Sequence, residues 1–317
     1  MRILITGGFG FVGGRLAQHL QQVGHQIVLG SRKARNFPVW LPQAEVIQTD
    51  WKDRHALEQT CTGVDVVIQA AGVSAQDCEA DPSAALEFNG LATASLVEAA
   101  SRAGVKRFVY LSTAHVYANP LIGSIAEDTC PRNLHPYATS HLAGENSALY
   151  ASQRGNILAI VLRLSNAFGA PVHKDVNSWT LLVNDLCRQA VQTRKLVLRS
   201  SGLQQRDFIT LTDVGRAVGH LLGLNQADCG DGLFNLGGGH SISVCDMAQR
   251  ISSRCEITLG YLPDIERPSP LPGEQVVPLN FRSDKLRKTG FTLLGNLDEE
   301  IDRTLLVCEQ AWGRSEE

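Results

Sequence analysis

A glycine-rich turn directly after a short apolar strand is the feature that most constrains the fold of this chain. Residues 2–6 read Arg-Ile-Leu-Ile-Thr, and Gly8, Gly10 and Gly13 follow at the spacing G-x-G-x-x-G. Apolar residues then recur at helical spacing from Val12 onward. The first two glycines permit a tight turn close to a pyrophosphate, the third permits close packing of helix and strand, and the open helix amides attract negative charge. The segment predicts a dinucleotide-binding unit; a tight turn without a ligand is the alternative interpretation.

Five further apolar runs, separated by helical segments, follow the first strand. They are residues 26–29, 45–48, 64–69, 107–111 and 158–162. Short apolar strands that alternate with helices indicate a parallel sheet with helices on both faces. We therefore predict an α/β fold with a Rossmann-type doubly wound parallel sheet. Ligands of such sheets bind beyond the carboxyl ends of the strands, where polar clusters stand in this chain.

The chain is long for one domain, and the strict alternation of strands and helices ends near Gly169. We expect a dinucleotide-binding domain over residues 1–169 and a smaller substrate-binding lobe over residues 170–317. Segments around 208–222 are expected to return to the first domain.

Composition argues against several classes of protein. The 317-residue chain has a formal net charge of −3 and no basic run, so we expect neither nucleic acid nor a membrane surface as a partner. No stretch approaches the roughly 20 apolar residues of a membrane helix, and glycines interrupt any signal-peptide core. The eight cysteines are scattered without a C-x-x-C pair, which favours free thiols in a reducing cytoplasm over disulfides or a metal site.

The choice of dinucleotide is argued from the end of the second strand. An acidic residue there would bind the adenosine ribose and select NAD, but the chain has Ser31, Arg32 and Lys33. A guanidinium favours the 2′-phosphate, so NADP is expected to be preferred over NAD. Solvated loop charges are the alternative. Asp50, at the end of the third strand, is expected to accept from the adenine amine, or else to cap a helix.

Many motifs in a fixed order give the chain a family resemblance. They are the glycine turn at 6–13, Asp50-Trp51, Ala-Ala-Gly at 70–72, Asn89-Gly90, Leu-Ser-Thr-Ala-His-Val-Tyr at 111–117, Pro-Tyr-Ala-Thr-Ser at 136–140, Arg-Leu-Ser-Asn-Ala-Phe-Gly at 163–169, and the segments 206–209, 212–214 and 234–237. The chain resembles an extended short-chain dehydrogenase/reductase of the NAD-dependent epimerase/dehydratase family, whose members act mainly on nucleotide sugars.

The resemblance implies which residues bind the dinucleotide and which carry the chemistry. Thr113 would hydrogen-bond the reacting carbonyl or alkoxide and Tyr137 would move the proton, since hydride transfer at a carbinol carbon leaves or creates charge on oxygen. Ala114 and His115 stand where sugar 4,6-dehydratases of the family carry an acidic pair, which disfavours elimination. Besides Ser31, Arg32, Lys33 and Asp50, the implied cofactor site comprises Gly7, Gly8, Phe9, Gly10, Phe11, Val12, Gly13, Trp51, Ala70, Ala71, Gly72, Asn89, Tyr137 and His141.

One position departs from the family pattern. The motif is Tyr-x-x-x-Lys, and His141 stands in place of the lysine. That lysine normally holds the ribose hydroxyls and lowers the tyrosine pKa by its charge. Tyrosine titrates near pH ~10 and histidine near ~6.5, so a neutral imidazole would not supply this field. Three interpretations remain: His141 orients the ribose in an active enzyme, catalysis is slow or lost and the protein regulates, or His115 or His135 handles the proton.

The resemblance also implies a substrate site that holds a nucleotide diphosphate. Arg206 is expected to anchor a phosphate through charge-assisted contacts, with a surface ion pair to Asp207 as the alternative. Arg267 is offset from the place where the family has a second arginine, which leaves a non-nucleotide substrate open. The full set of expected substrate residues is Ser74, Thr113, His115, Asn166, Arg206 and Arg267.

The resemblance further implies a homodimer through the helix at about 84–103 and the helix of Tyr137. The apolar residues considered are Leu86, Leu91, Leu96, Val97, Leu142 and Leu149, which could equally cover the chain's own sheet. We expect a cytoplasmic NAD(P)-dependent enzyme that reduces a keto sugar of a nucleotide sugar with NADPH. The alternatives are a nucleotide-sugar 4-epimerase with transient oxidation, or a catalytically weak NADP(H)-binding regulatory protein.

Overall fold

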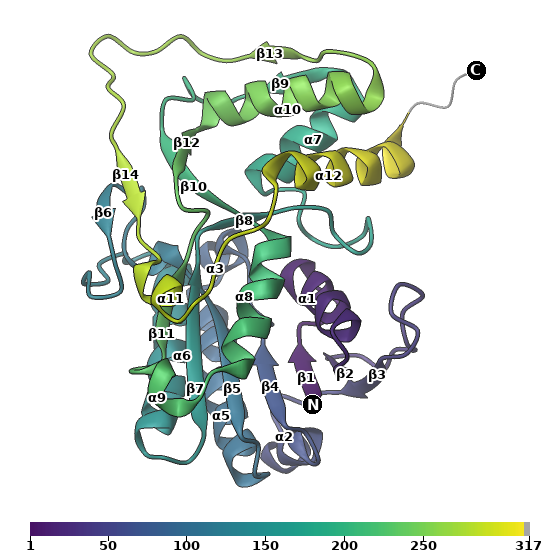
Figure 1. The fold of residues 1–317 in the computed structure, drawn as a ribbon, viewed down its shortest axis with the longest axis vertical. Coiled ribbons are helices and arrows are strands. Elements are labelled where there is room, and N and C mark those ends of the chain that lie inside the picture. Colours follow the sequence, from purple (N-terminus) through teal and green to yellow (C-terminus); the bar gives the residue numbers. More distant parts are fainter. Residues whose placement is uncertain (314–317) are drawn as a thin grey trace.

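A parallel sheet of seven strands lies at the centre of this computed structural model, which describes residues 1–313 (Figure 1). The strand order is β11-β7-β5-β4-β1-β2-β3, and every neighbouring pair is parallel. The expected α/β fold with a Rossmann-type sheet is therefore confirmed. The strands are β1 (Arg2–Thr6), β2 (Gln26–Ser31), β3 (Glu45–Gln48), β4 (Val66–Gln69), β5 (Arg107–Thr113), β7 (Leu158–Leu164) and β11 (Leu233–Leu236).

Both faces of this sheet are covered, which explains why its inner strands are apolar throughout. In β1, Ile3 and Ile5 face one hydrophobic cluster and Leu4 faces another. Helices α1 (Phe11–Gln22) and α8 (Leu211–Gly223) cover the first face. The second face is covered by α2 (Arg54–Cys61), α5 (Thr93–Arg102) and α6 (Pro136–Gln153).

The helix expected at about 84–103 is three consecutive pieces in the structure. They are α4 (Pro82–Ala85), a π-helical segment η1 (Leu86–Ala92) and α5, preceded by α3 (Ala75–Ala80). Leu96 and Val97 of α5 are buried against the sheet, so they are not available for a dimer surface. Leu86 and Leu91 of η1 are exposed. Leu142 and Leu149 of α6 are partly buried against the chain's own clusters. The homodimer stays a prediction.

The second part of the chain builds a lobe over the carboxyl ends of the sheet strands (Figure 1). Its helices α7 (Leu182–Thr193), α10 (Val244–Leu259) and α12 (Leu297–Trp312) share a hydrophobic cluster. The short strands pair as β12-β10-β8, β13-β9 and β14-β6. They are β6 (Gly123–Ile125), β8 (Asn166–Phe168), β9 (Lys195–Val197), β10 (Gln205–Thr210), β12 (Ser241–Ser243), β13 (Asp264–Glu266) and β14 (Leu279–Phe281). The remaining short helices are η2 (Ala114–Val116), α9 (Gln226–Cys229) and α11 (Asp284–Lys288).

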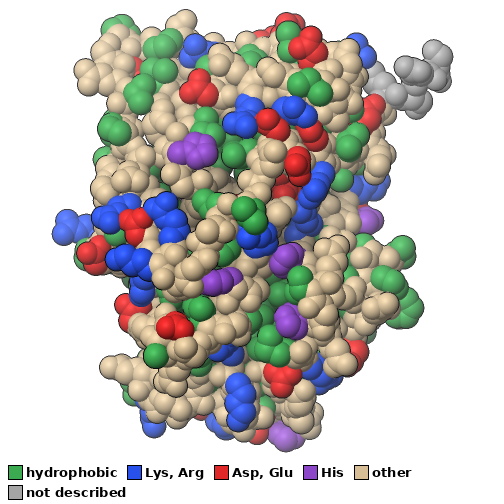
Figure 2. Space-filling view, in the orientation of Figure 1, with side chains coloured by type: hydrophobic (Ala, Val, Ile, Leu, Met, Phe, Trp, Pro, Cys, Tyr) green, Lys and Arg blue, Asp and Glu red, His purple; other side chains and the backbone are tan. Residues whose placement is uncertain are grey.

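Segments beyond residue 169 contribute to both parts of the molecule. Helix α8 packs on α1, and β11 pairs with β7 at the edge of the large sheet. The division at residue 169 stays a prediction. Figure 2 shows basic and acidic side chains next to one another on one face. In the part of the chain that the structure describes, Asp284 pairs with both Arg282 and Arg287.

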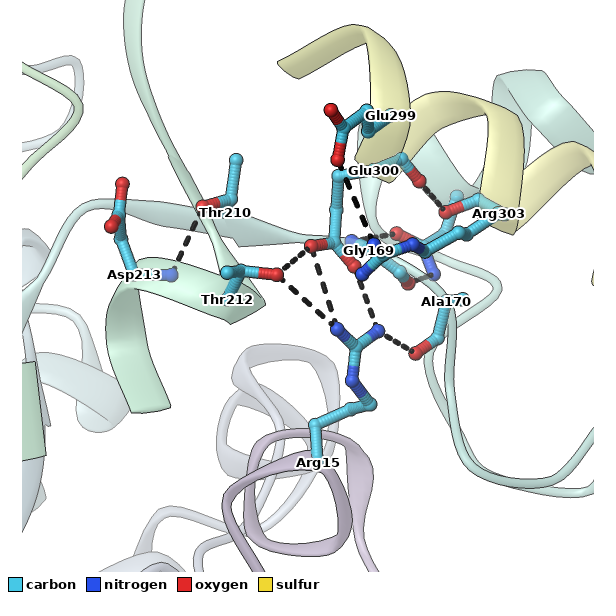
Figure 3. Close-up of polar contacts among 11 residues, drawn as sticks. Arg15, Gly169, Ala170, Thr210, Thr212, Asp213, Glu299, Glu300 and Arg303 are labelled. Carbon is cyan, nitrogen blue, oxygen red and sulfur yellow. Dashed lines mark hydrogen bonds and ion pairs between the residues drawn. The ribbon is translucent and has the colours of Figure 1, made fainter. Parts of the chain in front are cut away.

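A buried polar network joins the two parts of the chain (Figure 3). Arg15 of α1 donates to Glu300 of α12 at 2.7 Å and to the carbonyl of Ala170 at 2.9 Å. Thr212 of α8 donates to the second oxygen of Glu300 at 2.6 Å. The side chain of Glu300 is only 2% exposed, so its charge is compensated by these donors rather than by water.

Removing this carboxylate is expected to destabilise the fold. Glu300→Ala leaves Arg15 partly buried without its partner, and such a loss costs about 3 kcal/mol of unfolding free energy. The neighbouring Glu299 is exposed and lies 3.6 Å from Arg303, so Glu299→Ala is the matched control, with an expected change within about 0.5 kcal/mol. Urea denaturation of the two variants measures the difference. Equal losses in both would contradict the assignment.

Candidate active site

The glycine turn between β1 and α1 has the geometry of a phosphate cradle. Gly7 has φ +67°, and a Cβ there would lie 2.7 Å from the backbone of Ala71. A Cβ on Gly13 would lie 2.3 Å from the carbonyl oxygen of Gly7, so this glycine lets α1 approach the strand. The first turn of α1 has no acidic residue and no side-chain cap. Its amides are therefore free to meet an anion, and the turn fits a dinucleotide pyrophosphate.

A cavity of about 770 Å³ extends from this turn across the carboxyl ends of the central strands. Its size suits a large extended ligand. Of the expected cofactor residues, those lining it are Gly7, Phe9, Gly10, Phe11, Val12, Ser31, Arg32, Lys33, Trp51, Ala70, Ala71, Gly72, Tyr137 and His141. Four others, Gly8, Gly13, Asp50 and Asn89, do not line it.

Two of these four support the cavity from behind. Gly13 sets the helix position, and the side chain of buried Asn89 accepts from the Val73 amide at 2.9 Å and donates to Ser140 at 3.0 Å. Asn89 lies in the π-helical segment, and such segments are frequent at functional sites. Asp50 is exposed and its carboxylate accepts from the Lys52 amide at 3.0 Å. The structure thus gives Asp50 a local turn contact.

One end of the cavity is basic. Arg32 lies over the Phe88 ring at 5.6 Å, and Arg35 lies over the Phe9 ring at 4.9 Å. Within residues 1–313, neither these arginines nor Lys33 form an ion pair. Arg35 was missed by the sequence reasoning, although it stands only two residues beyond Lys33. The aromatic contacts hold the guanidinium groups at the rim of the cavity.

Tyr137 lies at the start of α6 because a proline and a histidine fix that end. Pro136 occupies the first turn, and the His135 side chain accepts from the Tyr137 amide at 3.1 Å. His135 is thus used as a helix cap and lines neither cavity. Burial raises the pKa of Tyr137, and a hydrogen bond with Thr113, at the end of β5, offsets part of this shift. At neutral pH the phenol is therefore protonated.

His141 lies one helical turn beyond Tyr137, with ring centroids 4.6 Å apart. Its Nδ1 is 2.8 Å from the hydroxyl of Tyr110, a buried residue of β5 that the sequence reasoning missed. Burial lowers the pKa of His141 to about 4. The imidazole is neutral at physiological pH, as expected for a residue that cannot replace the charge of lysine.

The low pKa of His141 predicts a pH-dependent stability. Between its ordinary pKa of 6.5 and about 4, the unfolded chain binds a proton at this residue and the folded chain does not. Above pH 6.5 the neutral His141 therefore costs no stability. As the pH is lowered the free energy of unfolding falls, and at pH 4 it is about 3 kcal/mol lower because of this residue. Comparing urea denaturation of wild type and His141→Gln across this range isolates the effect. Parallel pH curves for the two proteins would contradict it.

A second cavity of about 380 Å³ adjoins the first, because Phe11, Val12, Ser112, Tyr137 and Leu164 line both. Tyr137 thus stands where the two cavities meet. Four of the expected substrate residues, Thr113, His115, Asn166 and Arg206, line this second cavity.

Arg206, on β10, brings an uncompensated charge to the second cavity. Burial lowers its pKa, and it forms no ion pair in the part of the chain that the structure describes. Asp207 instead accepts from the Gly238 amide at 2.7 Å, so the alternative of an Arg206–Asp207 pair is wrong. The pKa of His115 is lowered first by burial and then by Arg206. A partly buried cation without a carboxylate partner is a natural site for an anionic substrate group.

Two expected substrate residues lie elsewhere. Ser74 lines the larger cavity and caps α3 by accepting from the Asp77 amide at 3.2 Å. Arg267 is exposed, donates to the carbonyl of Ser201 at 2.5 Å and lines neither cavity. Phe88 and Asn177 line the larger cavity and carry no sequence signal that singles them out.

Residues 1–313 show neither a metal-binding cluster nor a membrane-spanning helix. This part of the chain holds no group of three or more His, Cys, Asp or Glu side chains arranged to bind a metal ion. No helix in it is long and apolar enough to cross a membrane. All eight cysteines are free, and only Cys130 is exposed.

Comparisons with known proteins agree with this geometry. A family model described as NAD dependent epimerase/dehydratase family matches residues 3–237. UDP-glucose 4-epimerase of Haemophilus influenzae is 30% identical over 291 residues, which cover 82% of this chain and 85% of that protein. UDP-glucose 4-epimerase of Streptomyces lividans is 28% identical over 287 residues and covers 84% of each chain.

A solved structure is similar to almost the whole chain. MoeE5 in complex with UDP-glucose and NAD has a TM-score of 0.78 at 25% identity, covering 98% of this chain and 99% of that chain. The residues matched by the family model include the glycine turn, Tyr137 and β11. The chain belongs to the NAD-dependent epimerase/dehydratase family of the extended short-chain dehydrogenase/reductases, and it is an enzyme of that family.

Proposed function

We propose that the protein reduces a keto group of a nucleotide sugar with NADPH, and that Tyr137 donates the proton. The observation that carries this proposal is the position of Tyr137, which lines both the dinucleotide-sized cavity and the smaller cavity that holds Arg206. A group bound in either cavity would have access to the same phenol. The bound dinucleotide would supply the hydride.

The residues of the smaller cavity have complementary roles in this proposal. Arg206 binds the diphosphate, which directs the sugar rather than the nucleotide toward Tyr137. Thr113 hydrogen-bonds the carbonyl oxygen and Tyr137 gives that oxygen a proton as its charge develops. The raised pKa of Tyr137 favours the protonated phenol, and neutral His141 supplies no charge to lower it. Both features suit a proton donor better than a base.

A second candidate is 4-epimerisation of a nucleotide sugar. The similarity to UDP-glucose 4-epimerases over more than four fifths of the chain favours it. In that reaction Tyr137 first removes the proton of the 4-hydroxyl and later returns it. The deprotonated phenol would then be needed, without the cation that normally stabilises it.

One experiment distinguishes the candidates. The purified protein is incubated with NADPH and a UDP-4-keto-hexose, and separately with UDP-glucose and NAD. Reduction predicts one NADPH oxidised for each UDP-hexose formed from the UDP-4-keto-hexose. It also predicts that no UDP-galactose is formed from UDP-glucose. Interconversion of UDP-glucose and UDP-galactose without net cofactor consumption would favour epimerisation. Dinucleotide binding without either reaction would contradict both and favour a regulatory role.

The preference for NADP gives a separate prediction. Arg32 lies unpaired at the rim of the larger cavity, so Arg32→Asp removes a partner of the 2′-phosphate and adds a like charge. The ratio of Kd values for NADP and NAD, measured by calorimetry, should move at least tenfold toward NAD, which corresponds to about 1.4 kcal/mol. Lys106→Asp makes the same type of charge change just before β5, at the opposite end of the sheet. An equal shift in both variants, or none in Arg32→Asp, would refute the placement of Arg32.

A further inference from the structure

A chain of buried polar side chains leads through the core to His141. Thr6 of β1 donates to the Oε1 of Gln69, at the end of β4. The Nε2 of Gln69 donates to the hydroxyl of Thr93, the first residue of α5, at 3.1 Å. Thr93 hydrogen-bonds Tyr110, and the Tyr110 hydroxyl lies 2.8 Å from the Nδ1 of His141. All five side chains are buried, so water does not compete for these contacts.

One direction of hydrogen bonding satisfies every member of this chain of side chains. Because the Oε1 of Gln69 accepts from Thr6, its amide nitrogen faces Thr93 and can only donate. The Thr93 hydroxyl therefore accepts that bond, and its own proton is free for the oxygen of Tyr110. In this arrangement Tyr110 uses its one hydroxyl proton to donate to Nδ1 of His141. A neutral imidazole that accepts at Nδ1 carries its proton on Nε2.

The Nε2 atom of His141 faces the larger cavity. A Cβ built on Gly72 would lie 3.8 Å from this nitrogen, and both Gly72 and His141 line the cavity. Within residues 1–313, Nε2 has no hydrogen-bond partner. Gly144 allows this arrangement, since a Cβ there would lie 2.8 Å from the Tyr110 hydroxyl and push α6 away from β5.

We propose that Tyr110 is a positioning residue that fixes His141 in the Nε2–H tautomer, so that the imidazole presents one uncharged hydrogen-bond donor to the dinucleotide cavity. This donor stands where the family motif has the lysine that holds the ribose hydroxyls. The ribose as its partner rests on the proposed function, whereas the tautomer rests only on the buried contacts. An uncharged donor avoids placing an unpaired cation in a buried site, and the low pKa of His141 agrees with this.

The tautomer can be measured directly. In protein labelled with ¹⁵N-histidine, the His141 signals are assigned by their loss in His141→Gln. We expect the wild-type free enzyme at pH 7 to show a protonated Nε2 and a hydrogen-bonded, unprotonated Nδ1. In Tyr110→Phe the Nδ1 resonance should move to the position of an unbonded nitrogen. A protonated Nδ1 in wild type, or an unchanged Nδ1 in Tyr110→Phe, overturns the proposal.

A matched variant controls for the loss of a buried hydroxyl. Tyr117 is also buried, and its hydroxyl donates to Asn235 at 2.9 Å. Tyr117→Phe should leave the His141 signals unchanged. If Tyr110→Phe does not fold, the wild-type spectrum still decides, because a protonated Nδ1 there overturns the proposal.

Dinucleotide binding tests the role of the donor. The Kd for NADP should rise about tenfold in Tyr110→Phe and less than twofold in Tyr117→Phe, with about 1.4 kcal/mol per tenfold. His141→Gln keeps an amide donor near the position of Nε2 and should bind NADP more tightly than His141→Asn, which does not. Equal affinities of these two variants would overturn the donor role. These readouts use no sugar substrate, so a failure of the reductase assay leaves them valid and is distinguishable from them.

Discussion

Tyr137→Phe should lower kcat by about 10²- to 10⁴-fold, the range expected when a positioned proton donor is removed. The phenol stands where the two cavities meet, and burial keeps it protonated at neutral pH. Phenylalanine keeps the ring and its edge contact with His141, so NADP binding should change less than threefold. A fall in kcat with little change in KM indicates an interaction made only in the transition state. Steady-state kinetics with a UDP-4-keto-hexose and NADPH measure both constants.

The same helix provides the control for this variant. Tyr150 is an exposed residue of α6, so Tyr150→Phe also removes one phenolic hydroxyl but leaves both cavities unchanged. Its kcat should equal that of wild type. If Tyr137→Phe retained more than a third of the wild-type kcat, another group would have to donate the proton. His115, the one imidazole that lines the smaller cavity, would then be the candidate.

Arg206→Met should weaken binding of UDP by roughly 100-fold. The guanidinium is partly buried near His115 without an ion pair in residues 1–313, and a charge-assisted contact to a phosphate contributes about 1.5–3 kcal/mol. Removing an unpaired, partly buried charge also removes a desolvation cost, so the Tm of the free protein should stay equal or rise. Calorimetry with UDP measures the expected loss of affinity, and thermal denaturation measures the expected equal or higher Tm. A catalytic or structural role alone would not combine weaker binding with unchanged or higher stability.

Arg267→Met is the matched control. Arg267 is exposed and bonded to Ser201, outside both cavities, so its loss should change the Kd for UDP less than threefold. Unchanged UDP affinity in Arg206→Met would contradict the assignment of the smaller cavity to the diphosphate. A large loss in Arg267→Met would restore the role that the family resemblance implies for that residue.

The parts of the fold that depend on local sterics were predictable from the sequence. Gly8 and Gly13 have no room for a Cβ, so glycine is required there and the turn can be recognised from the spacing of its glycines. Strands buried on both faces, such as β1 and β5, are continuous apolar runs. The carboxyl ends of parallel strands meet at one edge, which brings Thr113 near the glycine turn without further information.

The remaining features depend on contacts between distant segments. The residues of β11 were recognised only as a motif, because an edge strand of four residues has too little pattern to be identified alone. Leu96 and Val97 have the spacing of an exposed apolar face but pack on the chain's own sheet. Arg35 lines the cavity and lies over the ring of Phe9, which is 26 residues earlier in the chain.

His141 illustrates the same limit at the active site. Its position in the tyrosine motif is visible in the sequence, but its protonation state is set by burial and by Tyr110, which is 31 residues away. From the sequence, a tyrosine in a buried strand is normally interpreted as a residue of the hydrophobic core. Only the approach of α6 to β5 at Gly144 brings its hydroxyl to the imidazole.

A crystal structure with NADP and a UDP-sugar bound tests the central claim most directly. The account predicts the pyrophosphate on the amides of the glycine turn, the nicotinamide ring beside Tyr137, and the Tyr137 hydroxyl within about 3.2 Å of the reacting sugar oxygen. The diphosphate of the sugar nucleotide should contact Arg206. A Tyr137 hydroxyl turned away from both ligands, or a dinucleotide bound outside the larger cavity, would contradict the account.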